Sequence, residues 1–206
     1  MPRLILASTS PYRAELLDRL RLDFDAVGSD VDESPIPGET PQERAQRLAD
    51  LKAGAVAARF RATDTIVIGA DQTAALDGTV LRKPGNPDTA LAQLIACRGR
   101  SVFFYTAITV IDCRSGDAQR HLDTTEVRFS QLTDTDLERY IRLDEPFDCA
   151  GSFKAERLGA ALFDAVVSRD PTALVGLPLI RVAGILRELG LDPLRHGVPS
   201  AETAGG

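Results

Sequence analysis

Only three lysines occur in this chain, at Lys52, Lys83 and Lys154, although lysine and arginine together number 24. These positions keep a compact, strongly hydrated ammonium where most cations of the chain are planar guanidinium groups. Lys52 lies inside a helical apolar pattern, Lys83 follows a predicted turn, and Lys154 belongs to the run CAGSFKAE that begins at Cys149. The three lysines are therefore the first candidates for binding an anion. The alternative is that they are ordinary surface lysines.

Lys52 shares one face of a predicted helix with apolar residues. That face also carries Ala45, Leu48, Ala49 and Val56. Burying an unpaired ammonium is costly, so Lys52 needs a carboxylate, a phosphate or a path for its head group to water. The acidic stretch that ends at Glu33 is one source of a carboxylate, and simple solvation of that stretch is the alternative.

Asp71 stands at the end of a predicted strand that begins at Thr65, where sheet proteins commonly place groups that contact ligands. The turn at Asp77-Gly78 allows two registers for the strands around it. A two-residue turn would set Lys83 opposite Gln72 and turn Asp71 to the other face. A three-residue loop with a left-handed glycine would set Asp71 opposite Lys83. We predict the second register, because it brings a carboxylate and an ammonium together on one face.

Arg13 would be the third residue of a helix that follows Ser10 and has Pro11 in its first position. The positive end of the helix dipole disfavours a cation there by about 0.3–1 kcal/mol. A bound anion would remove this conflict, since backbone N–H groups, the guanidinium and the hydroxyls of Ser8, Thr9 and Ser10 could converge on one phosphate. The alternative is an arginine that points into water or pairs with a nearby carboxylate.

The run after Gly151 would, if extended, send Ser152, Lys154 and Glu156 to one face by the two-residue period of a strand. A hydroxyl, an ammonium and a carboxylate in that arrangement could bind a phosphate and a base edge side by side. The same alternation is typical of an ordinary half-exposed strand, which is the alternative interpretation.

The elements that must position these residues alternate between helices and strands. Strands are predicted over 4–7, 101–111, 119–129 and 158–163, in addition to the strand that begins at residue 65. Helices are predicted to begin at residues 11, 41, 87, 133 and 178, and the helices from 41 and 178 end near 60 and 189. Helices combined with both hairpins and single strands predict an α/β protein with a mixed sheet.

Length and composition predict one domain over residues 1–195 and a flexible C-terminal tail over residues 196–206. The net charge of -6 argues against binding of nucleic acid through a broad basic surface. Three scattered cysteines and two histidines argue against a disulfide framework, a structural zinc site and a histidine triad, and they favour a cytoplasmic location. Apolar runs are too short to cross a bilayer, so no membrane association is predicted.

The chain resembles the Maf-like nucleotide pyrophosphatases, and specifically their 7-methyl-GTP pyrophosphatase branch. The resemblance depends on motifs that occur in order from residue 4 to about residue 180. They are LILASTSPYR from Leu4, VDE from Val31, RLA from Arg47 with Lys52, GADQ from Gly69, KP from Lys83, CAGSFKAE from Cys149 and LVGLPL from Leu174. Several dispersed motifs in one order are more specific than any single motif.

The resemblance implies cleavage of the α–β phosphoanhydride of a nucleoside triphosphate, with Mg²⁺ or Mn²⁺ as divalent cation. It implies an elongated mixed β-sheet flanked by helices, bilobed with a central cleft, as in Maf/ITPase-like folds, and a homodimer. The implied catalytic residues are Asp71, Lys83, Lys52, Arg13 and Glu33, and the implied metal ligands are Glu33 and Asp71. The substrate-binding residues, from the resemblance and the residue patterns together, are Ser8, Tyr12, Gln72, Ser152, Lys154 and Glu156.

The family's positions for substrate choice correspond to Tyr12, Gln72 and Glu156. Tyr12 stands where a tryptophan is typical of this branch, so an aromatic ring for stacking on the base is kept. Relatives that favour dTTP and UTP carry a different sequence in place of residues 149–156, which favours a methylated purine here. A 7-methylguanine ring is cationic and presents N–H donors, and both properties suit the carboxylate of Glu156.

The resemblance also suggests a mechanism, in which Asp71 positions and deprotonates water while the cations stabilise the leaving pyrophosphate. A role for Asp71 as a metal ligand alone is an alternative. Other substrates, such as dTTP, UTP or another non-canonical nucleotide, remain open. A rival from another class is a nucleotide-binding regulator of cell division with little turnover, but the full set of acidic and basic groups favours an enzyme.

Overall fold

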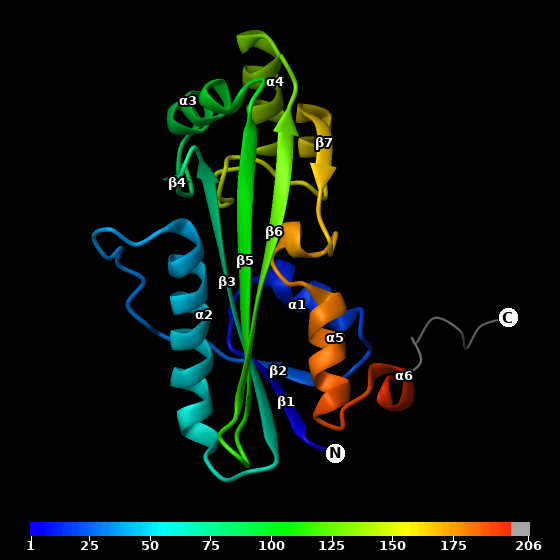
Figure 1. Ribbon diagram of the computed structural model, residues 1–206. Coiled ribbons are helices and arrows are strands. Elements are labelled where there is room, and N and C mark those ends of the chain that lie inside the picture. The colour runs from blue at the N-terminus through cyan, green and yellow to red at the C-terminus, as the bar shows by residue number, and fades with distance from the viewer. Residues whose placement is uncertain (199–206) are drawn as a thin grey trace, which may run out of the picture.

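A mixed β-sheet forms the long axis of the molecule (Figure 1). The structure is a computed structural model and describes residues 1–198. Its strands are β1 (Arg3–Leu6), β2 (Phe24–Ala26), β3 (Thr65–Leu76), β4 (Thr79–Leu81), β5 (Ser101–Asp112), β6 (Ala118–Phe129) and β7 (Phe163–Val167). The strand order is β2-β1-β3-β5-β6-β7, and β4 also pairs with β3. Strand β1 is parallel to both of its neighbours and the other pairs are antiparallel, so the predicted mixed sheet is confirmed.

Helices cover the sheet in two groups. The helices are α1 (Pro11–Asp18), α2 (Pro41–Ala57), α3 (Pro87–Cys97), α4 (Asp134–Asp144), α5 (Leu179–Glu188) and α6 (Pro193–His196), with short 3₁₀ helices η1 (Ala58–Phe60), η2 (Leu158–Leu162) and η3 (Ala173–Val175). Figure 1 shows α2 along one face of the sheet, α1 and α5 on the opposite face, and α3 and α4 at the far end. One core lies under α1 and α5 and another under α3 and α4, which gives the predicted bilobed shape.

Local sequence signals explain where several helices begin. Thr40 and Glu43 form the predicted capping box of α2, in which each side chain bonds to the backbone of the other residue. Asn86 caps α3 through a hydrogen bond from the backbone of Thr89. These caps satisfy N–H groups that have no partner within their helix.

Two parts of the predicted pattern are wrong, and a third lies partly outside the described residues. The predicted strand over 158–163 is mostly the helix η2, and strand β7 begins only at Phe163. Strand β2 was not predicted, because its three residues are half-exposed or exposed and carry no apolar run. Of the predicted tail over 196–206, residues 199–206 lie outside the described residues, while the N–H of Val198 donates a hydrogen bond to the carbonyl of Arg21.

The register around the β3–β4 turn is the two-residue one, so our prediction of a three-residue loop is wrong. Leu76 pairs with Thr79. Asp77 and Gly78 both have positive φ, at 48° and 78°, which is the backbone of a type I′ turn. Aspartate tolerates this conformation, so the turn closes without a third residue. Lys83 then lies beyond the end of β4 and is not paired in the ladder with β3.

One edge of β3 pairs with β1 at one end and with β4 at the other, and we call the unpaired stretch between them the fork of the sheet. Strand β1 pairs with β3 over Thr65–Ile68, and β4 pairs with the same edge only from Ala74 onward. Between them, over residues 69–73, no strand of the described chain pairs with this edge. The connections that leave β1 and β4 therefore diverge on either side of Asp71.

Gly69 allows α2 to lie unusually close to β3 in this region. A Cβ atom at this position would lie 2.5 Å from the carbonyl oxygen of Ala49 and 2.5 Å from the backbone nitrogen of Ala53. Real Cβ atoms do not approach backbone atoms so closely, so only glycine fits without moving the helix. This contact sets the distance between α2 and the middle of β3. Asp71 lies there, so the prediction that it stands at the end of its strand is wrong, because β3 continues to Leu76.

We expect Gly69→Ala to destabilise the protein by about 1–3 kcal/mol, because the added methyl group must push α2 away from the sheet. Urea unfolding followed by circular dichroism measures this effect. Gly54→Ala is the matched control, since Gly54 lies within α2 and an added Cβ there would contact nothing within 4 Å. The control should be stabilised by about 0.5–1 kcal/mol. Equal stability of the two variants would contradict the close packing of α2.

Candidate active site

The fork of the sheet opens into a cleft of about 800 Å³. This volume is in the range of small-molecule sites. Segments that are far apart in the sequence form its walls, including residues 7–13, 80–83, 148–150 and 174–176. Of the predicted site residues, the cleft brings together Ser8, Tyr12, Arg13, Glu33, Lys52, Asp71, Gln72, Lys83 and Glu156. Ser152 and Lys154 do not line the cleft.

Lys52 lies at the centre of this cleft between two carboxylates. Its Nζ atom is 2.7 Å from Oδ1 of Asp71 and 2.8 Å from Oε1 of Glu33. The side chains of Lys52 and Asp71 are each 10% exposed, whereas that of Glu33 is 53% exposed. The prediction that Lys52 needs a carboxylate is confirmed, and Asp71 supplies a second one.

The surroundings shift the pKa values of the two carboxyl groups in opposite directions. Burial raises the pKa of Asp71 above its usual range, and the positive charges of Lys52 and Arg13 only partly oppose this effect. Burial also raises the pKa of Glu33, but its hydrogen bond to Lys52 and the charges of Lys52, Arg13 and Lys83 lower it further, so the net shift is downward. Two carboxyl groups with opposite shifts are a common sign of different roles in one site.

Arg13 and Ser8 form the part of the cleft next to the start of α1. The guanidinium Nε of Arg13 donates to the carbonyl of Gly176 at 3.1 Å, and its Nη1 donates to Oγ of Ser8 at 3.4 Å. Ser10 is the N-cap residue, as predicted, but its side chain makes no capping hydrogen bond. Free backbone N–H groups, a hydroxyl and a guanidinium thus lie at the positive end of a helix, which favours an anion there.

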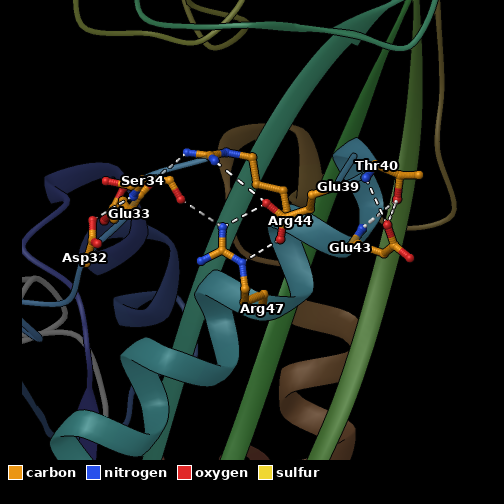
Figure 2. A network of polar contacts seen from close by, with 8 residues as sticks. All are labelled: Asp32, Glu33, Ser34, Glu39, Thr40, Glu43, Arg44 and Arg47. Carbon is orange, nitrogen blue, oxygen red and sulfur yellow. Dashed lines mark hydrogen bonds and ion pairs between the residues drawn. The ribbon is translucent and has the colours of Figure 1, made fainter. Parts of the chain in front are cut away.

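Two arginines of α2 hold the loop that carries Glu33 (Figure 2). Nη2 of Arg44 donates to the backbone carbonyl of Glu33 at 2.7 Å. Nη2 of Arg47 donates to the carbonyl of Ser34 at 3.2 Å and to Oε2 of Glu39 at 2.8 Å. The loop and Lys52 are therefore anchored to the same helix, which keeps Glu33 beside the ammonium even though its side chain is half exposed.

The side-chain amide nitrogen of Gln72 makes its hydrogen bonds to other residues of the protein. Nε2 donates to the backbone carbonyls of Ala173 and Leu174, at 2.9 and 3.0 Å, and to Oγ1 of Thr106 at 3.0 Å. These bonds fix the segment whose next glycine, Gly176, accepts the hydrogen bond from Arg13. Gln72 therefore lines the cleft and also supports the segment that orients Arg13.

Ser152 and Lys154 lie outside the cleft because the segment around them is not an extended strand. Gly151 and Ser152 both have positive φ, at 79° and 63°, so the alternation of side chains is broken. Oγ of Ser152 is buried and donates to Oε1 of Gln93 at 2.7 Å. Nζ of Lys154 donates to the carbonyl oxygens of Asp144 and Glu145, where α4 ends. The predicted alternation over this run is wrong.

The sequence of this chain matches a known family over nearly all of its length. Residues 3–189 match the family model described as Maf-like protein. This chain belongs to the Maf-like family. A 7-methyl-GTP pyrophosphatase of Burkholderia thailandensis is 52% identical over 207 aligned residues, which cover 100% of this chain and 96% of that protein. Another, from Xanthomonas campestris pv. campestris, is 55% identical over 192 residues, which cover 93% of this chain and 98% of that protein.

A solved structure shares the fold of this Maf-like protein. The HAM1 protein from Coxiella burnetii aligns with a TM-score of 0.51 and 15% sequence identity, over 91% of this chain and 100% of that chain. At this identity the likeness shows the fold alone. The predicted family and the elongated α/β fold are both confirmed.

The site of this Maf-like protein includes residues that were not predicted. Arg44 and Leu48 line the cleft beside Lys52. Leu48 was already placed on the helix face of Lys52. Arg44 lies on the same face by the same four-residue spacing, and this signal could have found it. Asp148 also lines the cleft, next to Tyr12, whose hydroxyl donates to its Oδ2 atom at 3.4 Å. No local pattern distinguishes Asp148 from the other acidic residues around it.

The oxygen atoms in this cleft suit a hard divalent cation. Carboxylates of Glu33 and Asp71 already converge on one positive charge, the ammonium of Lys52. Mg²⁺ is commonly held by one or two carboxylates together with phosphates of the substrate and water. No group of three or more His, Cys, Asp or Glu side chains in residues 1–198 could hold a metal ion. Two carboxylates of this cleft thus match the number that Mg²⁺ commonly takes from a protein.

Proposed function

We propose that this Maf-like protein is a nucleoside triphosphate pyrophosphatase that converts 7-methyl-GTP to 7-methyl-GMP and pyrophosphate. The observation that carries the proposal is the Lys52 ammonium between the carboxylates of Asp71 and Glu33, in a cleft that Arg13 and Lys83 also line. Relatives more than half identical over nearly the whole chain carry the name 7-methyl-GTP pyrophosphatase, which supports this choice of substrate.

The proposed reaction is attack of water on the α-phosphorus, which breaks the α–β phosphoanhydride and releases pyrophosphate. Asp71 orients the water and accepts its proton. It is the buried carboxylate of the cleft, and its raised pKa makes it a stronger base than an ordinary aspartate. Arg13, Lys52 and Lys83 neutralise the phosphates and stabilise the charge that develops on the leaving group. The rigid placement of these groups holds the reacting atoms in line.

We further propose that Glu33 and Asp71 hold a divalent cation when the substrate is bound. Such a cation supplies charge neutralisation at the phosphates and makes bound water more acidic. The cation would take a position beside the two carboxylates that pair with the ammonium of Lys52. The loop of Glu33, held by Arg44 and Arg47, keeps its carboxylate in reach of that position.

The decisive experiment is pyrophosphate release from a panel of nucleoside triphosphates, with Mg²⁺, with Mn²⁺ and with a chelator. We expect 7-methyl-GTP to give the highest kcat/KM and the chelator to abolish turnover. Preference for dTTP or UTP would replace the proposed substrate with the pyrimidine alternative. Binding of nucleotides without turnover would favour a nucleotide-binding regulator of cell division.

The pH dependence of turnover should report the raised pKa of Asp71. The carboxyl group must be ionised to accept a proton, so kcat/KM falls as the pH decreases through this pKa. We therefore expect the acidic limb of the profile to lie above the usual range of aspartate. A steady-state pH profile at constant ionic strength measures it. A rate that stays constant down to the usual aspartate range would contradict Asp71 as the proton acceptor.

We propose a cytoplasmic location and a homodimer for this enzyme, in line with the family. The three cysteines are free thiols, which suits a reducing compartment. Within residues 1–198, no helix is both long and apolar enough to cross a membrane. Fractionation of cells and light scattering of the purified protein test the two proposals.

A further inference from the structure

The cleft contains two groups of charged side chains with opposite sign. The cationic subsite, defined as Arg13, Lys52 and Lys83, surrounds the carboxylates already described. The acidic subsite, defined as Tyr12, Asp148 and Glu156, combines one aromatic ring with two carboxylates. A nucleoside triphosphate would place its phosphates in the first subsite, so its base would lie toward the second.

Asp148 contacts the ring of the acidic subsite directly. The hydroxyl of Tyr12 donates to Oδ2 of Asp148 at 3.4 Å, and Sγ of Cys149 lies 3.5 Å from Oδ1. Burial raises the pKa of Asp148, but a backbone hydrogen bond, Cys149 and the charge of Lys154 outweigh this effect and lower it overall. The carboxylate is therefore ionised at neutral pH. Its side chain is 59% exposed, so an incoming base can reach it.

Lys154 does not cancel the negative charge of this subsite. Its Nζ atom lies 3.7 Å from Asp148, but it donates hydrogen bonds to the carbonyl oxygens of Asp144 and Glu145 and does not line the cleft. Two carboxylates against one ammonium leave an excess of negative charge. Burial, together with Cys149, Asp148 and Glu156, raises the pKa of Tyr12 to about 12, so its ring stays neutral and can stack on a base.

We propose that Asp148 is a specificity-determining residue, which acts with Tyr12 and Glu156 to select a nucleotide whose base carries a positive charge. A cationic base that stacks on Tyr12 near the two carboxylates gains both cation–π and Coulomb attraction, whereas a neutral base gains neither. The inference rests on the proposed function for the placement of the triphosphate. It adds Asp148 to Tyr12 and Glu156, which the resemblance already assigned to the choice of base.

The test compares 7-methyl-GTP with GTP, which have the same triphosphate and differ in the charge of the base. We expect Asp148→Asn to reduce the ratio of the two kcat/KM values about fivefold, as for a partly exposed charge pair. Asp148→Glu should restore most of the ratio. Glu145→Gln is the control, since it removes a nearby exposed charge outside the cleft and should leave the ratio unchanged.

A binding measurement separates this inference from the proposed function. Calorimetry with 7-methyl-GMP and GMP should show tighter binding of the methylated product to the wild type, and loss of that preference in Asp148→Asn. If neither triphosphate is hydrolysed but this preference is found, the proposed function fails and the inference stands. If Asp148→Asn weakens both ligands equally, or leaves both ratios unchanged, the inference is overturned.

Discussion

Asp71→Asn should reduce kcat by about a thousandfold, within the 10²–10⁴ range for loss of a general base, with little change in KM. The amide has nearly the same shape as the carboxylate but cannot accept the proton of the attacking water. The variant should unfold at the same temperature as the wild type or higher. Because the native pKa of Asp71 is raised, its ionised form costs stability at neutral pH, and this cost disappears below the pKa of the unfolded state.

Asp123→Asn is a matched control for this experiment. Asp123 is also a buried aspartate on the sheet, 5% exposed against 7% for Asp71, and burial raises its pKa as well. It does not line the cleft. Turnover should therefore survive in Asp123→Asn. Full turnover in Asp71→Asn would reject Asp71 both as proton acceptor and as metal ligand, while calorimetric titration of Mn²⁺ in the variant separates these two roles.

Lys52→Met should have the largest combined effect on stability and activity. Removal of the ammonium leaves the carboxylates of Asp71 and Glu33 facing each other without a cation. Breaking such a buried pair costs about 3–5 kcal/mol, and loss of a charge that stabilises the leaving group costs at least about 10² in kcat. The pKa of Asp71 should rise further, so the variant should become more stable as the pH decreases and one carboxyl group takes up a proton.

Lys83→Met separates the catalytic from the structural part of this effect. The side chain of Lys83 lines the same cleft but is exposed. Its loss should lower kcat while the free energy of unfolding changes by less than about 1 kcal/mol, as for an exposed charge. Urea unfolding and steady-state rates of the two variants measure the difference. Unchanged stability of Lys52→Met would contradict the central role of its ammonium between the two carboxylates.

Much of the fold could be predicted because local signals and tertiary packing agree. The capping box at Thr40 starts α2 where predicted, and the β-branched and aromatic runs over 101–111 and 119–129 pair as an antiparallel hairpin. The prediction that Lys52 pairs with a carboxylate is also confirmed, because its position on an apolar helix face buries an ammonium that must be paired. In each case one local pattern allows a single low-energy arrangement.

The failures occur where a local pattern allows several arrangements. The two registers at the Asp77-Gly78 turn differ by one residue, and the prediction chose the one that paired charges rather than the one that suits a type I′ turn. Lys83 still lines the cleft with Asp71, but from a loop instead of the strand ladder. The run from Ser152 would alternate its side chains only if it were extended, but Gly151 and Ser152 both have positive φ and form a turn that buries the hydroxyl.

Loops that fold over the cleft could not be predicted from spacing alone. The resemblance assigns a role to Glu33, and its acidic stretch is a possible partner for Lys52, but the arginines that hold its loop are identified only by their contacts. Asp148 reaches Tyr12 across 136 residues of sequence, and no local property of either residue indicates that contact. Such contacts depend on how the loops of the two lobes pack on either side of the fork of the sheet.

Three strands run through both lobes without interruption. Strands β3, β5 and β6 each contain 12 residues, a length of about 40 Å, and are hydrogen bonded to one another along most of that span (Figure 1). A sharp hinge between the lobes would have to break hydrogen bonds of this ladder, so the continuous strands resist such a movement. The sheet therefore holds the proposed cationic and acidic subsites at a preset spacing, and a ligand that matches this spacing spends little binding energy on reorganising the scaffold.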